Sequence, residues 1–235
     1  MDGKARINLI EQRELVHLIT GVLIFGSLWG FLEATLGGFL HMILFPNKGA
    51  IMSGIGVAIM ASALAIYKKP VMAIGIGTVA ASFKLLDVWI FALPPTSYHI
   101  VNPAVAIIIE ALAFSVITVF IMNRLARNAY IGIGAGVLMG LLSATAYINF
   151  ALYATPLEVL TRQGVNTAGP FIMNQGLVQA AFWGALLPLG YLGGEKLVAR
   201  ISLVSASKLL YSVSMAAGIS FCWIISAIAR IVGFN

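Results

Sequence analysis

Long apolar stretches divided by short polar breaks run along the whole chain, and this pattern predicts membrane-spanning helices. At about 1.5 Å of rise per residue, roughly 20 apolar residues cross a hydrocarbon core of roughly 30 Å. We expect about seven spans, at residues 17–44, 48–67, 71–93, 102–123, 129–154, 171–194 and 208–232. The predicted fold is all-α: a polytopic membrane helix bundle with a six-helix core and one further helix.

The segment before the first span is polar and charged, and it lacks the apolar core and cleavage site of a signal peptide. We interpret residues 1–16 as a cytoplasmic amphipathic lead-in to one integral membrane domain that covers residues 1–235. The remaining breaks are short and rich in proline, glycine, asparagine and charge, as in "YKKP" and "LPPTSYHIVNP".

Composition supports this class, because 60% of the residues are hydrophobic and only 9% are charged, against about 25% charged in soluble domains. The mean hydropathy is +1.00. The lipid bilayer is therefore the first expected partner. The single cysteine, Cys222, excludes a disulfide framework and a thiolate metal site. The identity of any cofactor stays open.

Membrane topology explains the distribution of the basic residues, so a nucleic-acid partner is not expected. If the amino terminus is cytoplasmic, ten of them fall on inner segments: Lys4, Arg6, Arg13, Lys68, Lys69, Arg124, Arg127, Lys196, Arg200 and Lys208. The outer segments carry three, Lys48, Arg162 and Arg230. This positive-inside bias predicts a multi-pass plasma-membrane protein with its amino terminus inside and its carboxyl terminus outside.

Four ionisable residues inside the spans converge on one depth. Helical rise places Glu33 roughly 24 Å above the cytoplasmic end, Lys84 and Asp87 at roughly 20–24 Å, and Glu110 at roughly 20 Å. Charged groups in a membrane interior cost at least about 2.5–3.5 kcal/mol each on insertion scales, so they normally face the bundle or a wet cavity and indicate function. We expect a solute pocket in the outer half of the membrane.

Other polar and aromatic residues are expected at or near that depth. The candidate ligand-binding residues are Glu33, Asp87, Glu110, Lys84, Trp29, His41, Asn102, Tyr147, Asn149, Asn174, Gln175 and Gln179. Gly26, Gly30 and Gly37 share the helical face of Glu33, so we expect this face to point into the bundle against another helix.

Structural alternatives remain open for these residues. Lys84 and Asp87, three apart on one helix, can neutralise each other as a local pair. Glu33 and Glu110 can be protonated, hydrogen-bonded core residues, and Trp29 can be ordinary core packing.

Familiar catalytic and metal-binding motifs are absent from the sequence, and we expect no enzyme. His41 and His99 are candidates for a metal site with a carboxylate at the outer rim. An intramembrane enzyme that uses the carboxylates as acid and base is an alternative reading.

The ionisable groups are confined to one layer, whereas a conduction path would place them along the full membrane depth. We therefore expect a transport protein that binds a small solute. Three carboxylates and one lysine favour a cationic or amine-bearing solute, and a zwitterion would use Lys84 as well. The alternatives are an autonomous ion- or proton-coupled carrier and a membrane subunit of a larger complex.

In size, hydropathy and predicted topology, and in its glycine-rich first helix "GSLWGFLEATLGGFL", the chain resembles the substrate-binding components of energy-coupling-factor micronutrient transporters. The resemblance implies a six-helix core that binds a vitamin or a trace metal. It also implies docking, through small residues of the first helices, to a transmembrane coupling subunit with two ATPases. The chain departs from the family in its seventh helix and in having Gly26 and Gly30 where an alanine-x-x-x-alanine pair is expected. It also lacks the histidine-bearing amino-terminal motif of the nickel and cobalt members.

Overall fold

Each predicted apolar stretch forms a membrane-length helix in the computed structural model, which describes residues 3–125, 128–162, 165, 167–201 and 208–233. Within these residues, seven helical spans are long and apolar enough to cross a membrane: Glu14–Met42, Lys48–Tyr67, Met72–Phe91, Tyr98–Leu125, Ala129–Ala154, Ala168–Val198 and Ser212–Ile231. The predicted all-α, multi-pass bundle is confirmed, and the predicted bounds differ from these by a few residues at most.

Three of the spans are interrupted by a turn of a different helix type. The elements in chain order are α1 (Gly3–Leu32), η1 (Glu33–Gly37), α2 (Gly38–Met42), α3 (Lys48–Tyr67), α4 (Met72–Ser82), η2 (Phe83–Leu85), α5 (Leu86–Phe91), α6 (Tyr98–Leu125), α7 (Ala129–Ala154), α8 (Leu157–Arg162), α9 (Ala168–Phe171), η3 (Ile172–Gly176), α10 (Leu177–Ile201) and α11 (Lys208–Ile231). The turns η1 and η3 are π-helical, and η2 is a 3-10 turn. The lead-in is not a separate element where it is described, because α1 runs from Gly3 into the first span without a break.

The ends of the helices follow from local backbone chemistry. Helix α3 ends at Tyr67 because Lys68 adopts the left-handed conformation, with φ of 53°, and its N–H bonds to the carbonyl of Leu64 at 2.9 Å. Pro70 follows two residues later and cannot continue the helix. At the start of α7, the side chain of Asn128 accepts a hydrogen bond from the N–H of Tyr130 at 2.9 Å.

Glycines bring the central helices into backbone contact. A Cβ added at Gly190 of α10 would collide with the carbonyl oxygen of Ala58 on α3, and one at Gly140 of α7 would lie 2.7 Å from Cα of Ala180 on α10. Because no side chain separates the backbones, the Ser62 hydroxyl of α3 donates to the Gly190 carbonyl oxygen at 2.8 Å. Helices α3, α7 and α10 therefore form a tightly packed group.

Helix α1 packs on α4 through the glycine face predicted from the sequence. A Cβ at Gly26 would lie 2.8 Å from the carbonyl oxygen of Ile76, and one at Gly30 would collide with the ring of Phe83. A Cβ at Gly37 would lie 3.7 Å from Cδ of Glu33. The prediction that these glycines face the bundle together with Glu33 is confirmed.

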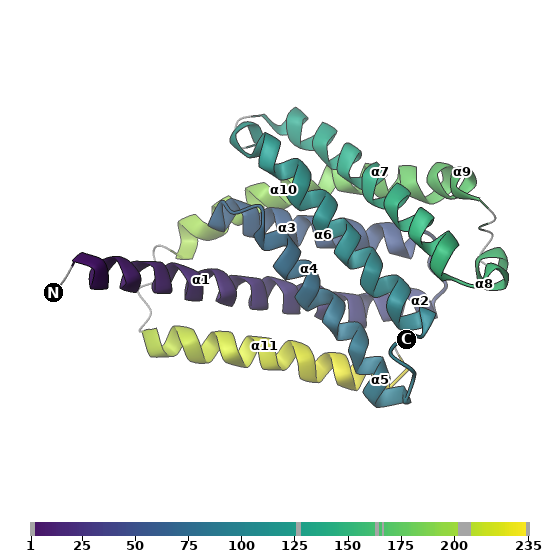
Figure 1. The fold of residues 1–235 in the computed structure, drawn as a ribbon, viewed down its shortest axis with the longest axis horizontal. Helices are drawn as coiled ribbons and strands as arrows, with labels where there is room; N and C mark the ends of the chain where they lie inside the picture. Colours follow the sequence, from purple (N-terminus) through teal and green to yellow (C-terminus); the bar gives the residue numbers. More distant parts are fainter. Residues whose placement is uncertain (1–2, 126–127, 163–164, 166, 202–207, 234–235) are drawn as a thin grey trace.

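Helix α11 lies at the edge of the bundle, alongside α1, with its end near α5 (Figure 1). Only 6% of its most apolar stretch is buried, against 28–67% in the other six spans. It is thus the least enclosed of the spanning helices in the described part of the chain.

Candidate functional site

Five buried or half-buried charged residues from four spans form what we call the polar layer: Glu33, Lys84, Asp87, Glu110 and Arg230. They come from η1, η2, α5, α6 and α11. Lys84, Asp87, Glu110 and Arg230 are each no more than 9% exposed, and the Glu33 side chain is 19% exposed. The four ionisable residues predicted to share one depth are brought together, and Arg230 is added to them.

The irregular helical turns coincide with predicted site residues. Glu33 begins the π-helical turn η1, Lys84 is the central residue of the 3-10 turn η2, and Asn174 and Gln175 lie in the π-helical turn η3. Such turns leave part of the regular helical hydrogen-bond ladder and are frequent at functional sites. The sequence pattern predicted continuous spans here and contained no signal for these turns.

Two ion pairs account for four of the five charges, with partners that the sequence did not reveal. Nζ of Lys84 lies 3.4 Å from Oε1 of Glu33, and Nη1 of Arg230 lies 3.0 Å from Oδ2 of Asp87. The three-residue spacing suggested that Lys84 and Asp87 pair with each other. In the structure, neither residue is the main ion-pair partner of the other. Each group instead pairs with a residue of another helix, because α1 and α11 flank this part of the third span.

Arg230 is a site residue that the sequence analysis missed. It was counted among the basic residues of the outer segments, whereas it lies in α11 with its side chain inside the bundle and is 5% exposed. The sequence did contain a signal for this residue. Arg230 lies within an apolar span, on the same helical face as Trp223, which precedes it by seven residues. Moving Arg230 into the layer leaves two outer basic residues against ten inner ones, so the predicted orientation is unaffected.

Glu110 is held by a polar chain that joins three helices. The indole N–H of Trp183 on α10 donates to Oγ of Ser53 on α3 at 2.6 Å, and the Ser53 hydroxyl is a polar neighbour of the Glu110 carboxyl group on α6. Among the described residues, no cation is within ion-pair distance of Glu110, and its charged neighbour is Glu33. Ser53 and Trp183 were not predicted, because their roles depend on the packing of α3 against α10.

Several other candidates lie at or beside the layer. Tyr147 is within electrostatic range of Glu110, and Trp29 is buried with its indole ring against Gly56. The amide of Gln179 donates to Oγ of Ser143 at 2.8 Å, which links α10 to α7.

Asn102 is engaged in an internal contact near the predicted outer end. Its side-chain amide donates to Oγ1 of Thr155 at 2.7 Å. This bond links the start of α6 to the segment that follows α7, where a small second core contains Ile148 and Leu160.

Three candidates are not brought to the layer. Asn149, Asn174 and Gln175 are exposed, and the Asn149 amide bonds to the Thr145 carbonyl of its own helix at 2.8 Å. Asn149 follows Tyr147 by two residues, about 200° around the helix, so both side chains cannot face the same cavity. These three side chains are therefore not part of the buried polar layer.

The two histidines do not form a metal centre with the carboxylates. His41 is exposed and bonds to the ammonium group of Lys48, and His99 is exposed and stacks on Tyr98 with ring centroids 4.0 Å apart. In the described ranges, no group of three or more histidine, cysteine, aspartate or glutamate side chains is arranged to hold a metal ion. The alternative of a metal site at the rim has no support in this geometry.

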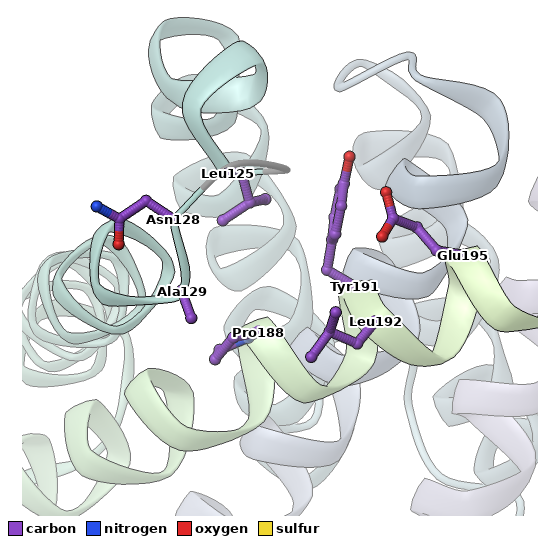
Figure 2. A pocket seen from close by; sticks show the side chains of 7 residues that line it. All are labelled: Leu125, Asn128, Ala129, Pro188, Tyr191, Leu192 and Glu195. Carbon is purple, nitrogen blue, oxygen red and sulfur yellow. The ribbon is translucent and has the colours of Figure 1, made fainter.

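A small pocket of about 120 Å³ lies at the other end of the bundle, where α6 ends and α7 begins. Tyr191 and Glu195 project side by side from α10 into it, and Leu125, Asn128 and Pro188 also line it (Figure 2). Nζ of the neighbouring Lys68 is 2.7 Å from the Tyr191 hydroxyl and 3.7 Å from Glu195. The charges here are half-exposed, unlike those of the polar layer.

The family resemblance predicts that small residues of the first helix, here Gly26 and Gly30, contact a coupling subunit. In the structure, both glycines pack against other residues of this chain. Gly26 and Gly30 face Ile76, Val79 and Phe83 of the same chain. They are therefore not free to contact a coupling subunit.

Comparison with known proteins identifies no relative: no family model, no curated protein and no solved structure matches this chain. The fold and the site define a multi-pass α-helical membrane protein with a buried layer of charged residues.

Proposed function

We propose that this protein is a membrane transport protein that binds a small solute at the polar layer, in the outer half of the plasma membrane. The observation that carries the proposal is the cluster of Glu33, Lys84, Asp87, Glu110 and Arg230 inside the bundle, with all but Glu33 buried. Burying charges in a membrane protein is costly even when they are paired, and such groups usually serve a ligand or ion. An uptake system in which this chain is the substrate-binding subunit fits a binding layer confined to one half of the bundle.

Buried polar atoms without protein partners support ligand binding near the layer. Oδ1 of Asp87, Nε of Arg230, Oδ1 of Asn102 and Nε1 of Trp29 have none within the described residues. An unsatisfied buried polar group costs about 1–3 kcal/mol, so a solute or water that bonds to these atoms would be stabilised there.

The charge balance favours a solute with a positive group. Asp87 and Glu33 have cationic partners, which leaves Glu110 as the carboxylate that a vitamin-like, amine-bearing solute or a metal would neutralise. Tyr147, which is within electrostatic range of Glu110, would add the face or hydroxyl of an aromatic ring to such a contact.

Native mass spectrometry of the detergent-purified protein tests this function. We expect a small molecule or metal to travel with the wild-type protein and to be lost from Glu33→Gln and Glu110→Gln, with folding checked by circular dichroism. Glu195→Gln is the matched control, since it removes a carboxylate from the half-exposed pair at the other end and should leave the bound species in place. Retention of the species by both layer variants would exclude the polar layer as its site.

A second function, that of an autonomous proton- or ion-coupled carrier, is favoured by Glu110 alone. This buried carboxyl group has no cationic partner among the described residues, so a proton or a monovalent cation is its simplest counter-charge. Proteoliposomes that contain only this chain separate the two functions. A solute-dependent proton flux that Glu110→Gln abolishes would establish the carrier, whereas a binding subunit of a larger uptake system would show none without its partners.

A further inference from the structure

Helix α11 covers the seam where the first and third spans meet. The indole of Trp223 stacks on the ring of Phe83 with centroids 3.9 Å apart, and the ring of Phe221 lies 6.2 Å from that of Phe31. Phe83 precedes Lys84 in η2, and Phe31 lies two residues before Glu33. The α11 aromatics therefore rest on the residues next to the Glu33–Lys84 ion pair.

Above these aromatic contacts, the same face of α11 carries Arg230. Trp223 and Arg230 are seven residues apart, about two helical turns, and they contact Phe83 and Asp87, which are one turn apart on the third span. Arg230 and Asp87 have side chains that are 6% and 9% exposed. One buried ion pair and one ring stack thus hold α11 against the polar layer.

The rest of α11 packs on the bundle along one side only. Its main contacts are with α1, η1 and α5, and only 6% of its most apolar stretch is buried, so most of its surface faces away from the bundle. A helix attached along one face opens at lower free energy than the enclosed α3–α10 pair. Its displacement would uncover both ion pairs of the polar layer at once.

We propose that α11 is a gate for the polar layer and that the Arg230–Asp87 pair is its latch. The proposal rests on the proposed function in that the layer is the site to which α11 controls access. When α11 opens, Asp87 loses its contact with Arg230 and contacts a solute instead. When α11 closes, the Arg230–Asp87 ion pair forms again. A buried ion pair suits a latch because its desolvation cost keeps its net stability modest, while its geometry specifies one closed arrangement.

Thiol accessibility tests the gate without any solute. Ser226 lies on the inner face of α11 with no exposed surface, so a Ser226→Cys, Cys222→Ala protein carries one reporter under the helix. Maleimide labelling of this reporter in detergent should be slow. The substitution Arg230→Gln should speed labelling by at least about tenfold, because reactivity of a buried thiol follows the population of the open state. The exchange Asp87→Arg with Arg230→Asp should return the rate toward the original value.

Two controls separate gating from general loosening. A reporter at Ser143 on α7, also buried, should stay slow when Arg230→Gln is introduced. Glu195→Gln, which breaks the exposed Lys68 pair, should leave the Ser226→Cys reporter slow. Equal labelling of the α11 reporter with and without Arg230→Gln would overturn the gate, as would equal acceleration of the α7 reporter.

Hydrogen exchange gives a second readout with the native serine and cysteine in place. Amides of α11 should exchange faster in Arg230→Gln than in wild type, while those of α7 keep their protection, and unchanged α11 exchange would contradict the gate. Neither measurement uses a solute. Retention of the bound species by both Glu33→Gln and Glu110→Gln in the mass spectrometry experiment would count against the proposed function, and unchanged α11 opening would count against the gate.

Discussion

Nη1 of Arg230 lies 3.0 Å from Oδ2 of Asp87, and this contact ties the last helix to the third span inside the bundle. The two residues are 143 positions apart in the chain. Both side chains are buried, so neither charge can be left alone without a large desolvation cost. The pair is thus both a structural contact and a constraint on how α11 can move.

Single neutralisation of this pair should destabilise the protein strongly. We expect Asp87→Asn or Arg230→Gln to lower the free energy of unfolding by up to about 3–5 kcal/mol, since each leaves one buried charge unpaired. The double variant should cost less than the sum of the two, because both charges are then removed together. Unfolding in detergent, followed by circular dichroism, measures all three.

The Lys68–Glu195 pair is the matched control for that series. Its side chains are 50% and 42% exposed, so neutralising either should change stability by less than about 1 kcal/mol. Strict additivity in the Asp87–Arg230 cycle would show that the two residues do not interact in the folded protein.

Ser53 should couple Trp183 to Glu110. Ser53→Ala removes the acceptor for the indole N–H and the hydroxyl group beside the Glu110 carboxyl group, with an expected loss of about 1–3 kcal/mol. Trp183→Phe keeps the buried ring but removes the N–H, so its effect should be smaller after Ser53→Ala than in wild type. Thermal unfolding of the two single variants and the double variant measures this coupling, and independent effects would contradict it.

Gly190→Ala should disrupt the contact of α10 with α3. The added methyl group would collide with the backbone of Ala58, so we expect a loss of about 1–3 kcal/mol or failure to fold. Gly193→Ala, three residues later, meets nothing within 4 Å and should be neutral or stabilising by up to about 1 kcal/mol, because alanine favours the helix. Equal stability of the two variants, compared by thermal unfolding, would mean that α3 and α10 do not approach this closely.

The predicted orientation is testable from either side of the membrane. In a Cys222→Ala background, His41→Cys should react with a membrane-impermeant thiol reagent added outside intact cells, and Lys196→Cys should react only after the inner face is exposed. Both positions are exposed and lie near opposite ends of the bundle. The reverse pattern would invert the topology derived from the positive-inside bias.

Much of the architecture was predictable because it depends on local composition and length. A run of apolar residues must be helical in lipid, since every backbone N–H and C=O needs an internal partner. The inward direction of Glu33 was predictable for a similar reason, because Gly26, Gly30 and Gly37 share its helical face. The shared depth of Glu33, Lys84 and Glu110 followed from helical rise alone.

The exposed candidate residues do not join the polar layer, because the depth of a residue in the membrane does not determine which face of its helix it occupies. Asn149 and Tyr147 lie at nearly the same depth, yet a separation of two residues sends them to different faces of α7. The turns η1, η2 and η3 were also not predictable, because glycines such as Gly37 and Gly176 occur in regular membrane helices as well as in such turns.

The sequence by itself determined a multi-pass α-helical membrane protein with ionisable residues gathered at one depth, since hydropathy and helical rise act along the chain. Only the tertiary structure decided which charges meet. Lys84 pairs with Glu33, Asp87 pairs with Arg230, and Glu110 neighbours Ser53, each across two helices. These partners depend on which helices lie side by side and how each is rotated, and that is set by the packing of the whole bundle.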